Sequence, residues 1–258
     1  MESTYDEKAE KSGILTTSWD VYACDKDSKR CLLYIDMGAI KQAPITAYPE
    51  FLKYSISGMR SMDNMSNTAE FDALENALVI LLEEVGVLVG IEIMEDTTTF
   101  MIYTKNTLEL EATLEAGIDL WGHTAVFYGF EDKDWDYYIS FLYPTDEQYI
   151  EIVNKNRVDK LEKQGDQLES IRSIEHYIVV ENMENIAAIC DELTEYYEQQ
   201  QIKKHQKEGC HIICLKEMGR PIDMVEPGIY LDLVAKSHGG KYDFWECEIV
   251  TNTGIVEV

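Results

Sequence analysis

Residues 71–104 read FDALENALVILLEEVGVLVGIEIMEDTTTFMIYT, and this stretch decides the fold. Its first part spaces apolar residues three and four positions apart, as on the buried face of an α-helix. These residues are Phe71, Leu74, Ala77, Leu78, Leu81, Leu82 and Val85. Asn67, with Glu70 three residues later, predicts the N-cap. The second part predicts two strands, Val87–Met94 and Thr98–Thr104, so a helix leads into a strand pair.

The elements on either side complete an α+β domain. We expect strands at Trp19–Cys24 and Cys31–Met37, an extended run at Phe51–Met59, a helix at Thr107–Ala116, a strand at Thr124–Phe130 and an extended segment at Asp134–Leu142. From Phe51 onward the order is strand, helix, strand, strand, helix, strand. This order is typical of the ferredoxin-like split βαβ pattern.

The second half of the chain predicts the same plan after a lead-in helix that ends at Gly165. We expect a strand at Ile174–Val180, followed by a helix that Asn182 caps. The buried face of that helix is predicted to hold Ile186, Ile189, Cys190, Leu193, Tyr196 and Tyr197. A strand at Cys210–Leu215 with a partner at Ile222–Val225 comes next, then a helix that starts at Pro227, buries Tyr230, Leu233 and Val234 and ends at Gly239, and finally a strand at Tyr242–Val250. We therefore predict two tandem ferredoxin-like (βαββαβ) sandwich domains with antiparallel sheets, residues 14–147 and 148–258.

The charge balance limits the partners of this chain. It has 22 Lys and Arg against 49 Asp and Glu, a formal net charge of −27. Nucleic acids and anionic membranes are themselves negative, so we expect direct binding to neither. A basic protein partner, bound in a salt-sensitive way, suits this charge. The acidity also has a simpler interpretation, in which it serves only solubility.

The expected compartment is the cytoplasm. No apolar stretch approaches the ~20 residues of a membrane-spanning helix, and the first residues lack the basic start and apolar centre of a signal peptide. The six cysteines, Cys24, Cys31, Cys190, Cys210, Cys214 and Cys247, include no CxxC pair. Cys24 and Cys31 could face each other across a hairpin, but we interpret all six as buried reduced thiols.

No motif in the sequence predicts chemistry. Asp132, Asp134 and Asp136 have the spacing that opens a calcium loop, but the glycine and glutamate that such a loop needs at its sixth and twelfth positions are tyrosines here. The histidines lack metal-ligand spacing, and there is no nucleophile elbow or phosphate loop. We predict no catalytic residue, no cofactor and no metal. Trp135, Tyr137, Tyr242 and Trp245 are either interface anchors or core residues.

The second half resembles the RraB family of ribonuclease E regulators. The similarity is carried by Arg157-Val158, Leu161, Gly165-Asp166, Arg172, Glu175-His176 and the run Gly239-Gly240-Lys241-Tyr242-Asp243-Phe244-Trp245-Glu246. Phe244 departs from the family's G-x-Y-D-G-W-E ending, where glycine is common. The resemblance implies an acidic, ferredoxin-like regulator that binds the noncatalytic region of ribonuclease E and slows RNA decay.

The first half resembles a bacterial domain of unknown function that is often fused ahead of RraB-like domains. The similar features are Trp19, Tyr48-Pro49, the acidic amphipathic helix, the strand Phe100–Tyr103 with Thr104, and Asp134-Trp135-x-Tyr137 leading to Leu142-Tyr143-Pro144. That family has no assigned activity, so the resemblance implies only a fold and a boundary.

These observations together predict a non-catalytic, acidic, protein-binding regulator of a ribonuclease or of the RNA-decay machinery. Its candidate recognition or family-signature residues are Asp134, Trp135, Tyr137, Arg172, His176, Gly240, Tyr242, Asp243, Trp245 and Glu246. The alternatives are an enzyme, with carboxylates or His176 and Arg172 in a cleft between the domains, and a small-molecule sensor with its site there. The identity of the partner and the oligomeric state stay open.

Overall fold

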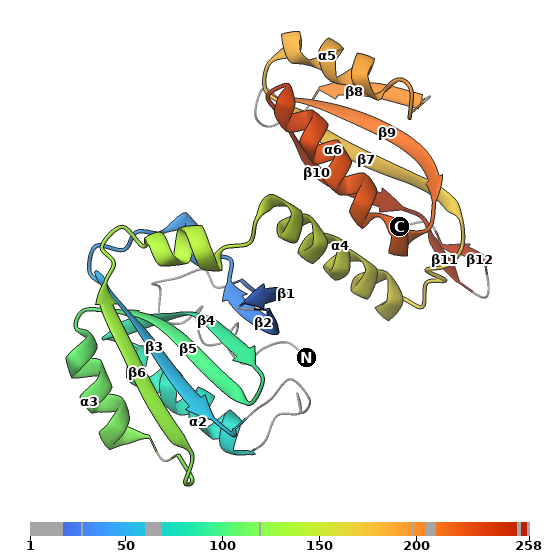
Figure 1. Ribbon diagram of the computed structural model, residues 1–258. Coiled ribbons are helices and arrows are strands. Elements are labelled where there is room, and N and C mark those ends of the chain that lie inside the picture. The colour runs from blue at the N-terminus through green and yellow to red at the C-terminus, as the bar shows by residue number, and fades with distance from the viewer. Residues whose placement is uncertain are drawn as a thin grey trace. The chain divides into compact units, whose positions relative to one another are not determined.

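The chain forms two compact units, of which the first ends at Pro144 and the second begins at Thr145 (Figure 1). The computed structural model describes residues 18–26, 28–59, 69–118, 120–197, 199–204, 210–251 and 254–256 of the 258. Each unit has its own antiparallel main sheet with helices packed on it. Among the described residues, no helix has the length and apolar composition needed to cross a membrane.

The first unit is a six-stranded sheet in the order β1-β2-β4-β5-β3-β6. Its strands are β1 (Trp19–Lys26), β2 (Lys29–Asp36), β3 (Glu50–Ser57), β4 (Gly86–Met94), β5 (Thr97–Thr104) and β6 (Thr124–Glu131), and its helices are α2 (Ala69–Leu82) and α3 (Thr107–Gly117), with a short 3-10 turn η1 (Ala39–Lys41). The chain order β3-α2-β4-β5-α3-β6 inserts β5 between β3 and β4, as in ferredoxin-like folds. The β1–β2 hairpin extends this sheet beyond β4.

The core of the first unit lies between one face of the sheet and the two helices. Phe71, Leu74, Leu78 and Leu82 of α2 are buried in one cluster with residues of β3, β4, β5 and α3. Each such side chain contributes roughly 1.5–3 kcal/mol on burial. This is the apolar face that the spacing predicts, with Ala77, Leu81 and Val85 half-buried at its border. The predicted cap Asn67 lies outside the described residues.

The second unit is a four-stranded sheet in the order β10-β7-β9-β8, preceded by a long helix. Its elements are α4 (Asp146–Lys163), β7 (Arg172–Val180), α5 (Met183–Leu193), β8 (Gln199–Lys204), β9 (His211–Gly219), η3 (Pro221–Asp223), α6 (Val225–Ser237), β10 (Gly240–Cys247), β11 (Ile249–Thr251) and β12 (Gly254–Val256). The order β7-α5-β8-β9-α6-β10 is again ferredoxin-like. The predicted fold class, two tandem βαββαβ domains with antiparallel sheets, is confirmed.

The ends of the helices in the second unit follow local capping rules. Thr145 and Gln148 form a reciprocal capping box at the start of α4, and Asn182 caps α5 by accepting a hydrogen bond from the N–H of Glu184. Gly165 and Gly239 follow α4 and α6 with φ of 79° and 71°. This left-handed conformation costs glycine least, which is why both helices end there.

The segment Asp134–Leu142 is not extended, so that prediction is wrong. It forms a turn followed by a π-helix, η2 (Tyr138–Leu142). Aromatic and β-branched residues are typical of strands. Here, however, the Asp132 carboxylate accepts hydrogen bonds from the N–H groups of Asp136 and Tyr137, which starts a helical turn.

The strand predicted at Ile222–Val225 is also wrong. Those residues belong to η3 and to the first turn of α6, and Pro227 is the third residue of that helix, not the first. β9 pairs with β7 on one side and with β8 on the other, the latter from Gln199↔Lys216 to Lys204↔His211. Glutamine and lysine dominate β8, so no apolar alternation reveals it.

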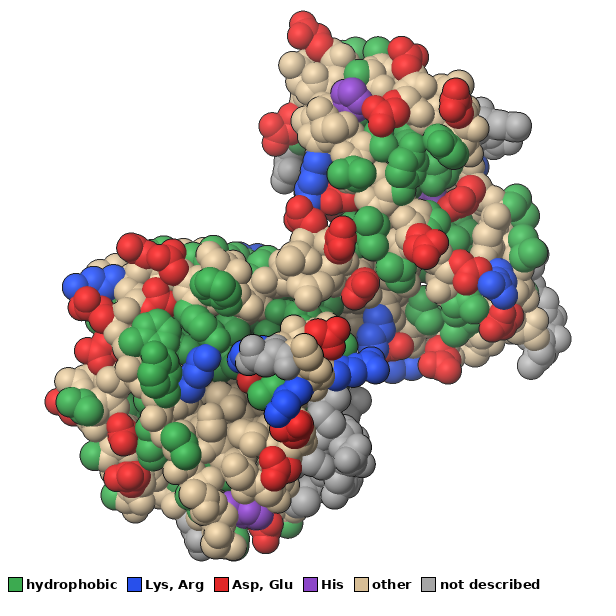
Figure 2. Space-filling view, viewed as in Figure 1, with side chains coloured by type: hydrophobic (Ala, Val, Ile, Leu, Met, Phe, Trp, Pro, Cys, Tyr) green, Lys and Arg blue, Asp and Glu red, His purple; other side chains and the backbone are tan. Residues whose placement is uncertain are grey.

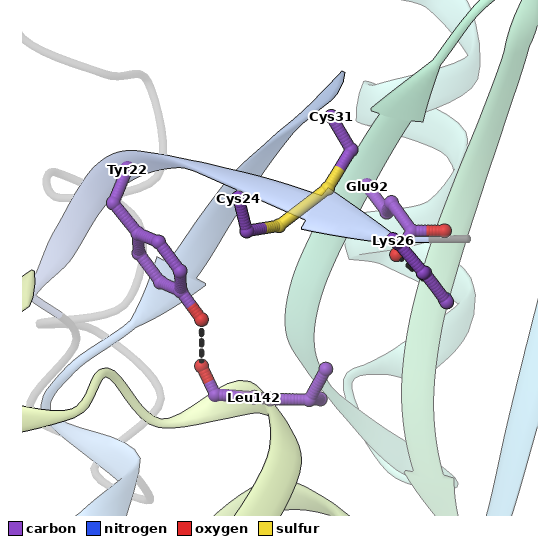
Figure 3. Close-up of a disulfide and its surroundings, with 6 residues drawn as sticks. All are labelled: Tyr22, Cys24, Lys26, Cys31, Glu92 and Leu142. Atoms are coloured by element: carbon purple, nitrogen blue, oxygen red, sulfur yellow. Dashed lines mark hydrogen bonds and ion pairs between the residues drawn. A yellow bond between two sulfur atoms is a disulfide. The ribbon is translucent and has the colours of Figure 1, made fainter. Parts of the chain in front are cut away.

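A disulfide joins Cys24 of β1 to Cys31 of β2 (Figure 3), so the expectation of a reduced thiol is wrong for this pair. The two residues are direct partners in the antiparallel ladder, and their Cα atoms lie 5.3 Å apart, within disulfide reach. The cross-link sits beside the ion pair of Lys26 Nζ and Glu92 Oε2, 2.8 Å apart. Cys190, Cys210, Cys214 and Cys247 are thiols, and of these only Cys214 is buried.

Candidate functional site

Trp135 is a core residue of the first unit. Its side chain is fully buried, and Nε1 donates a 3.0 Å hydrogen bond to the backbone oxygen of Tyr48. Its ring stacks on that of Tyr103 with centroids 3.9 Å apart. This packing holds Trp135 at a φ of 58°, which bulky residues rarely adopt. Asp134, directly before it, is exposed.

Asp132, whose spacing with Asp134 and Asp136 suggested only the start of a calcium loop, has a structural role that its sequence context does not reveal. Its buried carboxylate accepts hydrogen bonds from the Tyr103 hydroxyl at 2.6 Å and from the N–H groups of Asp136 and Tyr137 at 3.0 and 2.9 Å. Burial raises the pKa of Tyr103, and the hydrogen bond to Asp132 raises it further. The Asp132 carboxylate therefore caps the helical turn that begins after it. Within the described ranges, no three His, Cys, Asp or Glu side chains converge as metal ligands.

Tyr137 belongs to an aromatic surface on the first unit. Its hydroxyl lies 2.6 Å from Lys53 Nζ, which donates to it, and its ring lies 4.6 Å from that of Phe51 and 5.5 Å from that of Phe141. Phe141 is 71% exposed. Figure 2 shows hydrophobic side chains gathered beside basic ones on this unit. Tyr137 is thus half-buried between the core and an exposed aromatic neighbour.

Arg172 is buried and fastens chain segments of the second unit together. Its Nη1 and Nη2 form a two-point ion pair with the Asp166 carboxylate at 2.5 and 2.9 Å. The same nitrogens donate to the backbone oxygens of Glu248 and Gln167 at 2.7 and 2.6 Å. Asp166 also accepts from the N–H of Val250 at 2.8 Å. These bonds offset the desolvation of both charges and tie the loop after α4 to β11.

His176 and Tyr242 form a buried hydrogen-bonded chain with Glu217 on the helix-covered face of the second sheet. Nδ1 of His176 is 2.9 Å from the Tyr242 hydroxyl, and Nε2 is 2.7 Å from Oε1 of Glu217. Each ring nitrogen of His176 therefore has one hydrogen-bond partner. Burial raises the pKa of Tyr242, which keeps that hydroxyl a donor. Both ring nitrogens of the fully buried histidine are therefore satisfied.

The opposite face of the second sheet carries Glu246 in another cluster. The Tyr177 hydroxyl donates to Glu246 and also lies 3.0 Å from Oε2 of Glu175. Lys216 forms an ion pair with Glu175 and lowers the pKa of that carboxyl. Phe244 stacks on Tyr177 with centroids 4.7 Å apart. Glu246 is exposed, but it already has a partner within its own sheet.

Trp245 anchors α4 to the second sheet. It is 3% exposed, and its Nε1 donates a 2.9 Å hydrogen bond to Oδ1 of Asn154. Arg157 of α4 lies over the rings of Phe244 and Trp245, at 4.9 and 5.4 Å from their centroids. Burial lowers the pKa of Arg157. The phenylalanine that departs from the RraB pattern thus packs against both an arginine and a tyrosine.

Gly240 and Asp243 have separate roles on β10. A Cβ on Gly240 would lie 3.1 Å from Cδ1 of Ile189, so glycine lets α5 approach the strand closely. The ladder between β10 and β7 shifts register between Tyr242 and Phe244, and this β-bulge leaves Asp243 exposed. Gly240 therefore serves packing, while Asp243 contributes charge to the surface.

An exposed acidic and aromatic surface lies where α5 and α6 meet. Tyr196, just after α5, is 66% exposed, and its ring lies 5.4 Å from that of Tyr230 on α6. Leu233, one turn after Tyr230, is 68% exposed. Desolvation raises the pKa of Tyr230, and electrostatic interaction with Tyr196, Glu192 and Glu195 raises it further. We call Glu192, Glu195, Tyr196, Tyr230 and Leu233 the α5–α6 patch.

Helical periodicity predicts Tyr196 and Leu233 for the core, and both are exposed instead. α5 ends at Leu193, so Tyr196 lies beyond the helix and its spacing no longer determines its direction. In α6 the buried positions are Leu231, Val234 and Ala235. Figure 2 shows hydrophobic side chains between acidic ones on this unit. The patch could be located from the sequence only by knowing where α5 ends.

The ten residues singled out from the sequence do not form one centre. They divide between the two units, and within the second unit His176 bonds to Tyr242, Glu246 bonds to Tyr177, and Arg172 bonds to Asp166. The exposed members are Asp134, Asp243 and Glu246, and the buried ones are Trp135, Arg172, His176, Tyr242 and Trp245.

Fold and surface together define a protein of two tandem ferredoxin-like domains, with a buried His176–Tyr242 pair in the second domain and exposed tyrosine and leucine side chains at the α5–α6 patch. Residues 17–143 match the family of unknown function DUF695, and residues 151–247 match the family described as regulator of ribonuclease activity B. These matches confirm both resemblances, of the first half to a domain of unknown function and of the second half to the RraB family.

Other comparisons add little. No curated protein matches this sequence significantly. One similar solved structure is described as a "putative glycine cleavage system transcriptional repressor". It is 9% identical, the match covers 76% of this chain and 95% of that chain, and the TM-score is 0.22. A similarity this low carries no conclusion, so the fold class rests on the strand orders of the two sheets.

Proposed function

We propose that this chain is a non-catalytic regulator that binds a basic protein partner, a ribonuclease or another component of RNA decay, through the α5–α6 patch. The match of residues 151–247 to the regulator family supports the class of function. The choice of this surface rests on the exposure of Tyr196 and Leu233, which are 66% and 68% exposed near Glu192 and Glu195.

The chemistry of the α5–α6 patch suits arginine-rich protein segments. Tyrosine is a favoured anchor of protein interfaces because it buries a large area with few rotatable bonds. A guanidinium group stacks on a tyrosine ring and pairs with a carboxylate through two parallel hydrogen bonds. Glu192 and Glu195 supply carboxylates near Tyr230, and Oε2 of Glu192 also lies 2.7 Å from Nε2 of His238. The patch therefore offers both contacts to one side chain.

The net charge of −27 supports a protein rather than an RNA ligand. RNA binding needs lysine and arginine to neutralise phosphates, and this chain has too few to overcome its carboxylates. An acidic protein attracts a cationic segment over long range and raises its association rate. In this proposal the regulator occupies basic residues that would otherwise contact RNA.

The test is a pull-down from host extract with the full chain as bait. Wild-type protein retains a basic, RNA-processing protein at low salt and loses it progressively as salt rises, because exposed charges are screened. The double variant Tyr196→Ala/Leu233→Ala retains much less, since both side chains are central to the patch. The fold is unchanged, because substitutions of exposed side chains rarely alter stability by more than about 0.5 kcal/mol.

Met218→Ala is the matched control, because Met218 is 68% exposed but lies on β9, outside the patch. It retains the partner as the wild type does. Recovery of no partner at low salt contradicts the proposal, as does equal recovery with the patch variant.

A further inference from the structure

The outer edge of β6 is open in the part of the chain that the structure describes. β6 ends the order of the first sheet and pairs on one side only, with β3, from Ser57↔Thr124 to Glu50↔Glu131. None of its eight residues is fully buried, although Val126, Phe127, Tyr128 and Phe130 are apolar. An open edge of this length presents unpaired backbone groups to any extended strand that approaches.

β6 lacks the features that protect β1 and β10, two other outer strands of the main sheets. Proteins block such edges with charges, lysines or bulges. β1 contains Asp20, Asp25 and Lys26, and β10 has both charged residues and a bulge. The sequence TAVFYGF, residues 124–130 of β6, has no charge, no proline and no lysine. This edge is therefore suited to strand pairing.

Two large apolar side chains of β6 are exposed. Val126 and Tyr128 are each 63% exposed and point to the same face of the sheet, since side chains alternate along a strand. The ring of Tyr128 lies 5.8 Å from that of Phe130, which contacts Tyr137 of the aromatic surface at 5.9 Å. The edge thus continues into a second exposed apolar area, where Phe141 is 71% exposed.

We propose that β6 pairs with β6 of a second copy of this chain, which gives a two-fold symmetric dimer with one sheet continuous across both copies. Two chains of net charge −27 repel each other over most of their surface, so they associate only where the surface is uncharged. Residues 124–130 form such a surface. Glu131 at the end of the strand is neutralised by Lys133, with Nζ and Oε1 2.7 Å apart.

The geometry of the fold permits this pairing. A two-fold axis perpendicular to the sheet places two copies of β6 antiparallel, with equivalent faces on the same side. Val126 and Tyr128 of one copy then meet those of the other as cross-strand neighbours, an aromatic and β-branched combination that stabilises sheets. The dimer is independent of the α5–α6 patch, which lies in the other domain.

The test is the mass of the full chain in solution, by size exclusion with light scattering or by sedimentation, from about 1 to 100 µM, the range of moderate affinities. Wild-type protein shows twice the chain mass at high concentration. Val126→Glu and Tyr128→Glu each give the mass of a single chain, because they place like charges opposite each other at the axis.

Ile80→Glu on α2 is the matched control, since Ile80 is 68% exposed and lies away from the edge. It keeps the wild-type mass, and circular dichroism shows that all variants are folded. A wild-type mass of one chain throughout the range overturns the proposal, and so does a Tyr128→Glu protein that stays dimeric.

Discussion

Burial separates the structural residues of the sequence motifs from the exposed ones. Trp135 and Trp245, the tryptophans of the two motifs, both lie in a core. Nε1 of Trp135 donates to the backbone oxygen of Tyr48, and Nε1 of Trp245 donates to Oδ1 of Asn154. The sequence identifies the two tryptophans, but it does not say whether their side chains face the core or the solvent. On β10 the direction depends on the bulge between Tyr242 and Phe244, because a shift of one residue turns every later side chain to the other face.

Removing Arg172 tests the contribution of its buried ion pair with Asp166 to stability. Arg172→Ala leaves Asp166 as a buried charge without its cation, so we expect the free energy of unfolding to fall by about 3–5 kcal/mol. Denaturant unfolding monitored by circular dichroism measures this change. The backbone oxygens of Glu248 and Gln167 lose their donor in the same variant.

Arg220→Ala is the control, since Arg220 is 43% exposed while it pairs with Asp223 and Glu169. An exposed pair contributes about 0–1 kcal/mol, so this variant unfolds close to the wild type. Equal losses in the two variants would refute the structural role of Arg172.

At the scale of elements, regular apolar spacing made most helices and strands predictable. α2 and the β4–β5 hairpin agree with their spacing because their faces are set by burial. β8 and η2 could not be predicted, for different reasons. β8 is a strand because β9 offers it backbone partners, while η2 forms because Asp132 caps it against the strand preference of its residues.

The β1–β2 hairpin carries the disulfide, and its loss tests that element. The cross-link closes a short loop with a sequence separation of 7. By the chain-entropy relation a loop of this size contributes about 2–3 kcal/mol. We expect a reductant to lower the melting temperature of the wild type, as monitored by circular dichroism of the full chain.

The double variant Cys24→Ala/Cys31→Ala should melt at the temperature of the reduced wild type and show no response to the reductant. If the reductant leaves the wild type unchanged, or shifts the double variant equally, the hairpin disulfide does not contribute to stability.

At the scale of the whole molecule, element order and charge were readable from the sequence, but the surface was not. The two strand orders follow from βαββαβ connectivity. The α5–α6 patch and the open edge of β6 follow from where α5 ends and from which strand lies outermost. Both depend on tertiary packing, which the spacing of residues in one sequence does not encode.

The most direct test of the central claim compares an arginine-rich peptide with single-stranded RNA as ligands of the purified full chain. Fluorescence anisotropy of each labelled ligand is measured at rising salt, with Tyr196→Ala/Leu233→Ala beside the wild type. The account predicts that the peptide binds, that its affinity falls with salt and in the variant, and that RNA does not bind. Tight binding of RNA, with no binding of the peptide at low salt, would contradict it.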